Sequence, residues 1–171
     1  MRFFFLLDSD VGVIDQDGFL SLKGRAKELI KKGGEQVSPL EVEEFLLTHP
    51  WVKIPICFSV PSKLYGEEVG CALVLSSEAP TSIAYRDINK AMRAWLKEAQ
   101  LAPIKWPTKW IVVTEDDLPM TKTNKFIRIG LSSKLGLDPK DESDQSGAKV
   151  PMKARIGEYI SYIILKKFFL N

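Results

Sequence analysis

"GRAKELIKKGGEQVSPLEVEEFL", residues 24–46, places a cluster of basic side chains and several glycines directly before an amphipathic segment. Its KELIKKGGEQV portion predicts a tight β-hairpin with Gly33 and Gly34 at the tip, because glycine accepts the positive φ that such turns need. The SPLEVEEFL portion predicts a helix, since Ser38 can cap its start and Pro39 fits its first turn. A hairpin that leads into a helix is therefore the starting point of the predicted fold.

The predicted helix after Ser38 has an acidic start and one apolar face. Glu41, Glu43 and Glu44 suit the positive end of the helix dipole. The helical spacing of the apolar residues predicts a buried face made of Leu40, Val42, Phe45 and Leu46.

Further elements follow on both sides of this region. VGVIDQDGFLSLKGR alternates apolar and polar residues around an Asp/Gly turn and predicts an earlier hairpin. VKIPICFSV and EEVGCALVLSS predict two strands joined by the loop PSKLYG, and KWIVVTE predicts a further strand. Residues 81–103 predict an amphipathic helix capped by Thr81 or Ser82, and NKFIRIGLSSKLGL predicts a short final helix. The buried side of the long helix is predicted to hold Ile83, Ile88, Met92, Trp95 and Leu96.

This order of elements predicts an α+β fold in which helices cover a small sheet that is preceded by a β-hairpin. "MRFFFLL" at the start predicts either a buried strand or the end of a preceding domain. Residues 138–151 are polar and nearly free of large apolar groups, which is typical of a linker. Residues 152–171 predict an amphipathic helix of unassigned role.

Composition narrows the classes of function. A net charge of +2 gives no overall field for nucleic acid, and no segment is long and uncharged enough to span a bilayer. Cys57 and Cys71 are too few for a disulfide scaffold, so we expect free thiols and an intracellular, cytoplasmic protein. The C-terminal residues KKFFLN are not a peroxisomal signal. The single histidine, His49, precedes a proline, where we expect a helix-end or turn role, and the sequence shows no metal-spaced Cys/His cluster.

Two lysine-bearing segments are the candidates for chemistry: residues 24–36 and LPMTKTNKFIR at 118–128. A lysine beside mobile backbone can reach a phosphate or a developing oxyanion as a movable positive charge. The alternative interpretation is a pair of solvated surface loops, because charged runs are usually exposed. Neither segment matches a Walker phosphate-binding loop.

The two segments, together with HPWVKIPICFSVPSKLYGEEVGCALVL between them, resemble the C-terminal domain of the AMP-dependent synthetase and ligase family. The resemblance covers about residues 9–135 and is strongest to the branch of 4-coumarate, medium-chain and oxalate acyl-CoA ligases. It implies that residues 1–23 end the large N-terminal domain and that 24–137 form the family's C-terminal domain. The family joins a carboxylic acid to ATP and then transfers the acyl group to coenzyme A. Its C-terminal domain is a lid that rotates between the two half-reactions.

The resemblance also implies roles in adenylation and in hinge motion. Lys125 falls on the adenylation lysine, which contacts the substrate carboxylate and the α-phosphate. Lys27 occupies the hinge position. Arg25 matches an arginine beside the ribose, and Asp10 matches the aspartate that binds the ribose hydroxyls. Asn124 replaces the family's usual glycine before the lysine, and we expect it to present Lys125 because asparagine tolerates left-handed backbone.

In the thioester-forming state, the resemblance places Lys31 and Gln36 on the nucleotide side of the active site. It places Gly33 and Gly34 beside the pantetheine arm of coenzyme A. Asp8 and Ser9 depart from the family's Thr-Gly before the aspartate, which indicates that the upstream sequence is either divergent or not the family's at all.

Two hypotheses follow. In the first, the chain is the lid of an acyl-CoA ligase that uses ATP with Mg²⁺ and coenzyme A, and it needs an N-terminal adenylation domain, in cis or in trans, for activity. In the second, it is a stand-alone binding module that docks on a partner through its C-terminal helix. We expect no metal site, no tightly bound cofactor and no nucleic-acid partner in either case.

Overall fold

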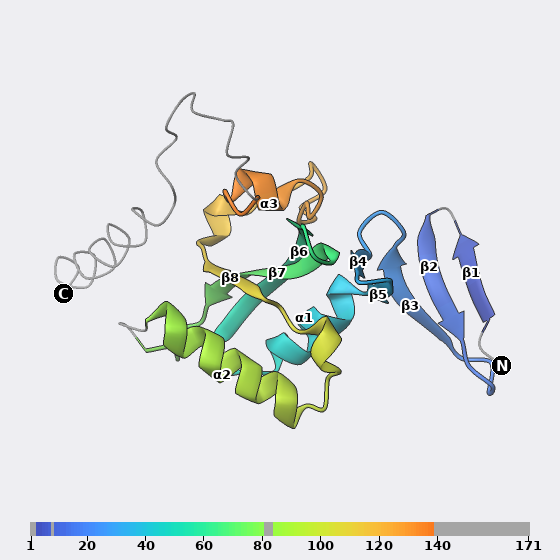
Figure 1. The fold of residues 1–171 in the computed structure, drawn as a ribbon, viewed down its shortest axis with the longest axis horizontal. Helices are drawn as coiled ribbons and strands as arrows, with labels where there is room; N and C mark the ends of the chain where they lie inside the picture. Colours follow the sequence, from blue (N-terminus) through green and yellow to red (C-terminus); the bar gives the residue numbers. More distant parts are fainter. Residues whose placement is uncertain (1–2, 8, 81–83, 139–171) are drawn as a thin grey trace.

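The computed structural model describes residues 3–7, 9–80 and 84–138, which form two sheets and the helices that cover the larger one (Figure 1). The predicted linker beyond residue 138 and the predicted helix at 152–171 lie outside the described residues.

The N-terminal sheet has three antiparallel strands, β1 (Phe3–Leu7), β2 (Asp10–Ile14) and β3 (Leu20–Arg25), in that spatial order. The hairpin predicted around the Asp/Gly turn is therefore confirmed, and β1 adds a third strand to it. Asp15 holds the turn, because its carboxylate accepts hydrogen bonds from the backbone N–H groups of Asp17 and Phe19.

The second sheet contains β4 (Ile30–Lys32), β5 (Glu35–Val37), β6 (Val52–Ser62), β7 (Gly66–Leu75) and β8 (Lys109–Val112). Its spatial order is β5-β4-β7-β6, and β8 runs parallel to β7. The hairpin predicted at Gly33 and Gly34 is confirmed as β4 and β5. The loop expected between β6 and β7 is shorter than predicted, because the strands extend to Ser62 and restart at Gly66.

Helix α1 (Pro39–Leu47) begins where the sequence predicts, and the Ser38 side chain accepts a hydrogen bond from the Glu41 N–H at 3.3 Å. Two details of its faces were predicted wrongly. Leu40 is exposed, because the face toward the sheet centres on Pro39, Val42, Glu43 and Leu46. Glu43 is buried and does not serve the helix dipole; its carboxylate accepts hydrogen bonds inside the fold.

Helix α2 (Tyr85–Glu98) buries Ile88, Met92 and Leu96 as expected, and Trp95 is partly buried. The predicted cap at Thr81 or Ser82 is wrong, since the helix begins after Ala84, whose extended backbone serves as the N-cap without a side-chain hydrogen bond. Residues 81–83 lie outside the described residues. The short final helix α3 (Leu131–Lys134) is confirmed, but the first half of the predicted segment forms a loop.

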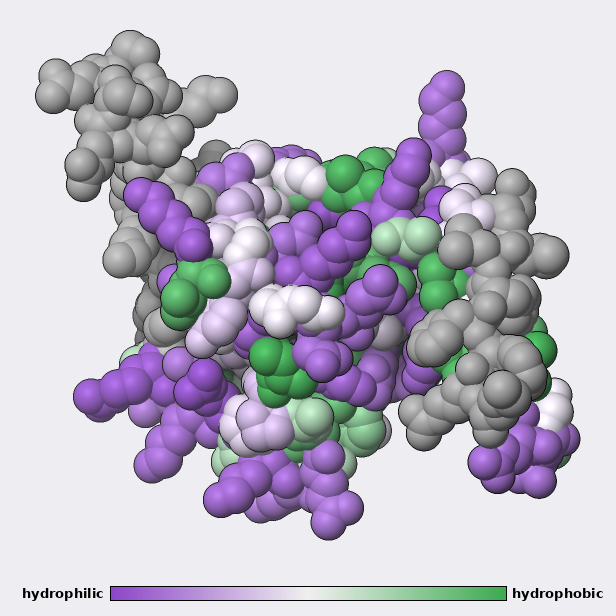
Figure 2. All heavy atoms as spheres, turned by 45° about the vertical axis from the view of Figure 1, so that its right-hand side comes forward, coloured by the Kyte–Doolittle hydropathy of each residue, from purple (hydrophilic) through white to green (hydrophobic). Residues whose placement is uncertain are grey.

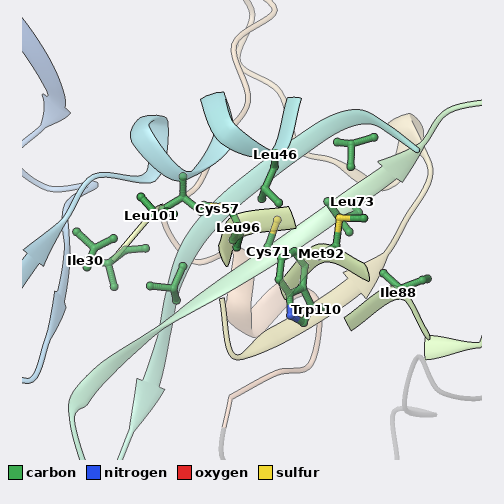
Figure 3. Close-up of a cluster of buried hydrophobic side chains, with 14 residues drawn as sticks. Ile30, Leu46, Cys57, Cys71, Leu73, Ile88, Met92, Leu96, Leu101 and Trp110 are labelled. Atoms are coloured by element: carbon green, nitrogen blue, oxygen red, sulfur yellow. The ribbon is translucent and has the colours of Figure 1, made fainter. Parts of the chain in front are cut away.

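Both faces of the second sheet are covered, so the molecule has two apolar clusters. Helices α1 and α2 pack on one face, where Cys57 and Cys71 lie among Leu46, Met92 and Leu96 (Figure 3). Both thiols are free, as expected. Helix α3 packs on the other face against alternate residues of β6 and β7, including Phe58 and Val60. Alternation along the strands thus supplies apolar side chains to both layers.

Candidate functional site

The β4–β5 hairpin brings four of the predicted site residues together. Lys31 and Gln36 are direct cross-strand partners, and both side chains are exposed. Gly33 and Gly34 form the turn with φ of 57° and 89°, which side-chain-bearing residues rarely adopt. The Gly33 N–H donates to the Tyr65 carbonyl at 3.0 Å, so this tip is held against the β6–β7 turn.

Alternation along β4 decides which lysine faces solvent. Lys31 points outward while Lys32 is buried, and burial lowers the pKa of Lys32 although the nearby Glu68 carboxylate opposes that shift. The Lys31 backbone N–H donates to the Glu67 carboxylate at 2.7 Å. Lys31 is therefore anchored through its backbone and leaves its ammonium available to a ligand.

Asp10 and Arg25 lie opposite each other at the end of the N-terminal sheet. Their side chains form an exposed ion pair with 3.8 Å between Arg25 Nε and Asp10 Oδ1. Lys27 follows in the turn 26–28 that connects the two sheets. The residue predicted as the hinge thus lies in the segment between two separately paired sheets.

Lys125 lies on an exposed loop closed by the Met120–Phe126 bridge and by a hydrogen bond from the Ile127 N–H to the Pro119 carbonyl. Asn124, directly before it, has a φ of 56°, so the expected left-handed backbone is confirmed. The Lys125 N–H donates to Thr121 Oγ1 at 3.1 Å. Lys31 lies on the β4–β5 hairpin and Lys125 on the loop closed by the Met120–Phe126 bridge, so the two lysines are presented by separate elements.

Sequence reasoning missed a buried charged cluster between these two parts, formed by Arg128, Glu43 and Glu28. Arg128 Nε and Nη2 bind the two oxygens of Glu43 at 3.2 and 2.8 Å, and Nη1 lies 3.5 Å from Glu28 Oε2. The side chains are only 15%, 9% and 19% exposed, respectively. No local pattern signals this cluster, because Glu43 and Arg128 are 85 residues apart in sequence.

The electrostatics of the cluster favour the charged guanidinium. Burial alone would lower the pKa of Arg128, but the hydrogen bonds and charge of Glu43, with that of Glu28, raise it. Glu43 Oε1 also accepts the Cys57 N–H at 2.7 Å. The cluster thus ties α1, strand β6 and two surface segments together through short-range polar contacts.

Other site types find no support in the described part of the chain. No group of three or more His, Cys, Asp or Glu side chains in it is arranged to hold a metal ion. His49 is buried, and its Nδ1 accepts the Trp51 N–H at 3.0 Å, which confirms its turn role. None of the helices described is long and apolar enough to cross a membrane.

Comparison with protein-family models matches residues 41–125 to the AMP-binding enzyme C-terminal domain. Among curated proteins, the chain is 43% identical over 119 residues to oxalate–CoA ligase of Arabidopsis thaliana, covering 70% of this chain and 21% of that enzyme. It is 39% identical over 119 residues to oxalate–CoA ligase of Saccharomyces cerevisiae. The chain thus spans about a fifth of the length of the curated relatives it matches.

Solved structures agree in fold. o-Succinylbenzoate CoA synthetase from Bacillus subtilis, in complex with its acyl-adenylate intermediate, aligns with a TM-score of 0.61 and 32% identity over 72% of this chain and 23% of that one. MatB from Rhodopseudomonas palustris with ATP bound gives a TM-score of 0.61 and 30% identity over 77% and 24%. The fold, the family model and the acyl-CoA ligase relatives lead to one conclusion: this chain belongs to the family of the AMP-binding enzyme C-terminal domain.

Proposed function

We propose that the chain is the lid domain of an ATP-dependent acyl-CoA ligase. The observation that carries this proposal is the presentation of two exposed lysines on separate elements, Lys125 on a loop after a left-handed Asn124 and Lys31 on strand β4 beside a glycine turn. A lid that serves two half-reactions needs such separate surfaces, because each step requires its own set of groups in the cleft.

In the first half-reaction, the substrate carboxylate attacks the α-phosphorus of ATP, an acyl–phosphate bond forms, and pyrophosphate leaves. Lys125 supplies a positive charge to the carboxylate and the α-phosphate, where negative charge accumulates during the displacement. Its exposed, hydrogen-bonded loop allows the ammonium to enter a cleft on another domain.

In the second half-reaction, the thiol of coenzyme A attacks the acyl carbonyl, its proton is released, and AMP leaves. Lys31 and Gln36 then face the nucleotide, and Gly33 and Gly34 leave room for the pantetheine arm because they carry no side chains. Asp10 and Arg25 are proposed to contact the ribose from the other side of the junction.

Rotation between the two states is proposed to occur at Lys27, in the turn between the sheets. On this proposal, residues 1–23, which include β1, β2 and the first part of β3, end the large adenylation domain. Residues 24–137 form the lid. Ser38 Oγ donates to the Lys23 carbonyl at 2.6 Å across this junction, so rotation must break that hydrogen bond.

The partner implied is an adenylation domain, in cis or in trans, that supplies the acyl pocket and most of the ATP site. Apolar side chains on the N-terminal sheet support this, because Phe19, Leu20 and Leu22 are all exposed, Leu22 by 63%. On the face drawn in Figure 2, hydrophilic side chains predominate and smaller hydrophobic patches lie between them. The free buried thiols support a reducing compartment such as the cytoplasm.

A domain graft tests the proposal. Residues 9–138 replace the C-terminal domain of the Arabidopsis oxalate–CoA ligase, and formation of the CoA thioester from oxalate is measured. We expect activity well above that of the same ligase truncated before its lid. A folded graft with no more activity than the truncated enzyme would contradict the proposal.

The size of the natural polypeptide separates the two hypotheses for the chain. An antibody against residues 80–100 should detect a band several-fold larger than 19.3 kDa if the adenylation domain lies in cis. A band at 19.3 kDa would instead require an adenylation domain in trans, which co-purification with the tagged chain would reveal; a 19.3 kDa chain without one would favour the stand-alone module.

A further inference from the structure

The buried cluster of Arg128, Glu43 and Glu28 connects the two surface segments that carry the proposed site lysines. Arg128 lies three residues after Lys125, immediately behind the loop that Ile127 closes through its hydrogen bond to Pro119. Glu28 lies one residue after Lys27 in the turn between the sheets. Arg128, at the base of the Lys125 segment, therefore contacts Glu28 at the base of the other segment.

The geometry of Arg128 suits a fixed anchor. Two of its nitrogens form parallel hydrogen bonds to both oxygens of Glu43, an arrangement that fixes the plane and direction of the guanidinium. Glu43 is itself held by the Cys57 N–H at the centre of strand β6. The third nitrogen is thereby directed at Glu28 Oε2, 3.5 Å away.

All three residues of the cluster lie on the C-terminal side of Lys27, the proposed hinge residue. Glu28, Glu43 and Arg128 all follow Lys27 in the sequence, whereas Ala26, before Lys27, donates its backbone N–H to the Ser9 carbonyl. Lys27 therefore lies between Ala26, which is tied to the N-terminal sheet side, and Glu28, which is anchored to Arg128. The backbone N–H groups of Glu28 and Leu29 donate to the Arg25 carbonyl across Lys27, so rotation at Lys27 must break these two hydrogen bonds.

We propose that Arg128 is a positioning residue that fixes the boundary of the moving unit after Lys27 and holds the Lys125 loop in constant register with it. The inference rests on the proposed lid function for its consequence: the two lysine surfaces rotate as one rigid body. A break in the cluster would then disturb both half-reactions, although Glu28 and Arg128 touch neither substrate.

Hydrogen exchange on the 171-residue chain tests the coupling without any activity. Arg128→Lys keeps the charge but loses the planar fork that joins two carboxylates, and Glu28→Gln removes only the link to the turn. In both variants we expect the N–H groups of Leu29 and Ile127 to exchange about five- to tenfold faster, since each reports a hydrogen bond at the base of one segment. Exchange in β6 and β7 should stay unchanged.

Glu41→Gln is the matched control. It removes the Glu41–Lys105 ion pair of 2.6 Å on helix α1, the helix that also carries Glu43, and it changes neither lysine-bearing segment. It should leave Leu29 and Ile127 unchanged. Two results overturn the inference: faster exchange at Leu29 alone in Glu28→Gln, which shows no coupling, or equal acceleration throughout the sheet, which shows a general loss of stability.

A second readout uses the two half-reactions of the ligase grafted with residues 9–138. Glu28→Gln should slow adenylate formation and thioester transfer by similar factors at an unchanged melting temperature, and loss in only one half-reaction would overturn the inference. Absence of both half-reactions in the unmodified ligase would refute the proposed function instead, while the exchange pattern would still decide the coupling.

Discussion

At the scale of single residues, burial determines what each charged or titratable group does. His49 is enclosed by edge-on contacts with Trp51 and Trp95, with ring centroids 5.1 and 4.9 Å away. Burial lowers the pKa of His49, and its unprotonated Nδ1 accepts the Trp51 N–H. A proton on Nδ1 would remove that hydrogen bond, so the folded chain resists protonation at this residue.

Acidification should therefore destabilise the fold through His49. The unfolded chain binds a proton at this imidazole below about pH 6.5, while the folded chain does so only at lower pH. The contribution of His49 to the free energy of unfolding is fully present well above about pH 6.5. It falls as the pH drops through this value, and the loss is at most about 1.4 kcal/mol at pH 5.5. His49→Asn retains an acceptor and should lose this part of the pH dependence in urea unfolding. An identical pH profile in the variant would contradict the assignment.

The Glu43–Arg128 ion pair should contribute far more to stability than the Glu41–Lys105 ion pair, although both glutamates lie on helix α1. Glu43→Gln leaves a buried guanidinium without its main counter-charge, which costs about 3 kcal/mol. Glu41→Gln, at a pair in which both side chains are roughly a quarter exposed, should cost less than about 1 kcal/mol. Equal losses in denaturant unfolding of the two variants would contradict the buried geometry.

At the scale of elements, β6 and β7 depend on close packing at one glycine. Gly70 lies opposite Phe58 in the register, and a Cβ there would meet Val60 Cγ2 at 2.6 Å and Phe58 Cε2 at 2.8 Å. Both neighbours are almost completely buried, so neither side chain can move away without disturbing the cluster beneath α3.

Gly70→Ala should thus destabilise the domain by about 1–3 kcal/mol through overpacking, despite the lower chain entropy of alanine in the unfolded state. The measurement is the midpoint of guanidinium unfolding at an unchanged m-value. A midpoint equal to or above that of the parent chain would show that the strands separate easily at this position.

Elements formed by local patterns were predictable, and contacts between distant segments were not. The glycine turn at 33–34 and the Ser38 cap follow from backbone preferences within a few residues. The start of α2 was missed because capping propensity favoured Thr81 or Ser82 over Ala84. Arg128 was missed because its partners come from other elements, and only the packed fold brings them together.

At the scale of the whole molecule, the two sheets and the turn between them give the proposed motion a physical basis. Each sheet is paired within itself, and the polar contacts across the junction include the hydrogen bond from Ser38 to Lys23. A lid of this kind changes which lysine reaches the active site without reorganising its own core. The role of Lys125 can then be separated experimentally from that of Lys31.

The most direct measurement is the rate of each half-reaction in the ligase grafted with residues 9–138, comparing Lys125→Ala with Lys31→Ala. We predict that Lys125→Ala lowers adenylate formation by about a hundredfold or more while thioester transfer from supplied acyl-adenylate changes little. Lys31→Ala should show the opposite preference. Equal loss of both half-reactions in the two variants would contradict the assignment of separate surfaces to separate steps.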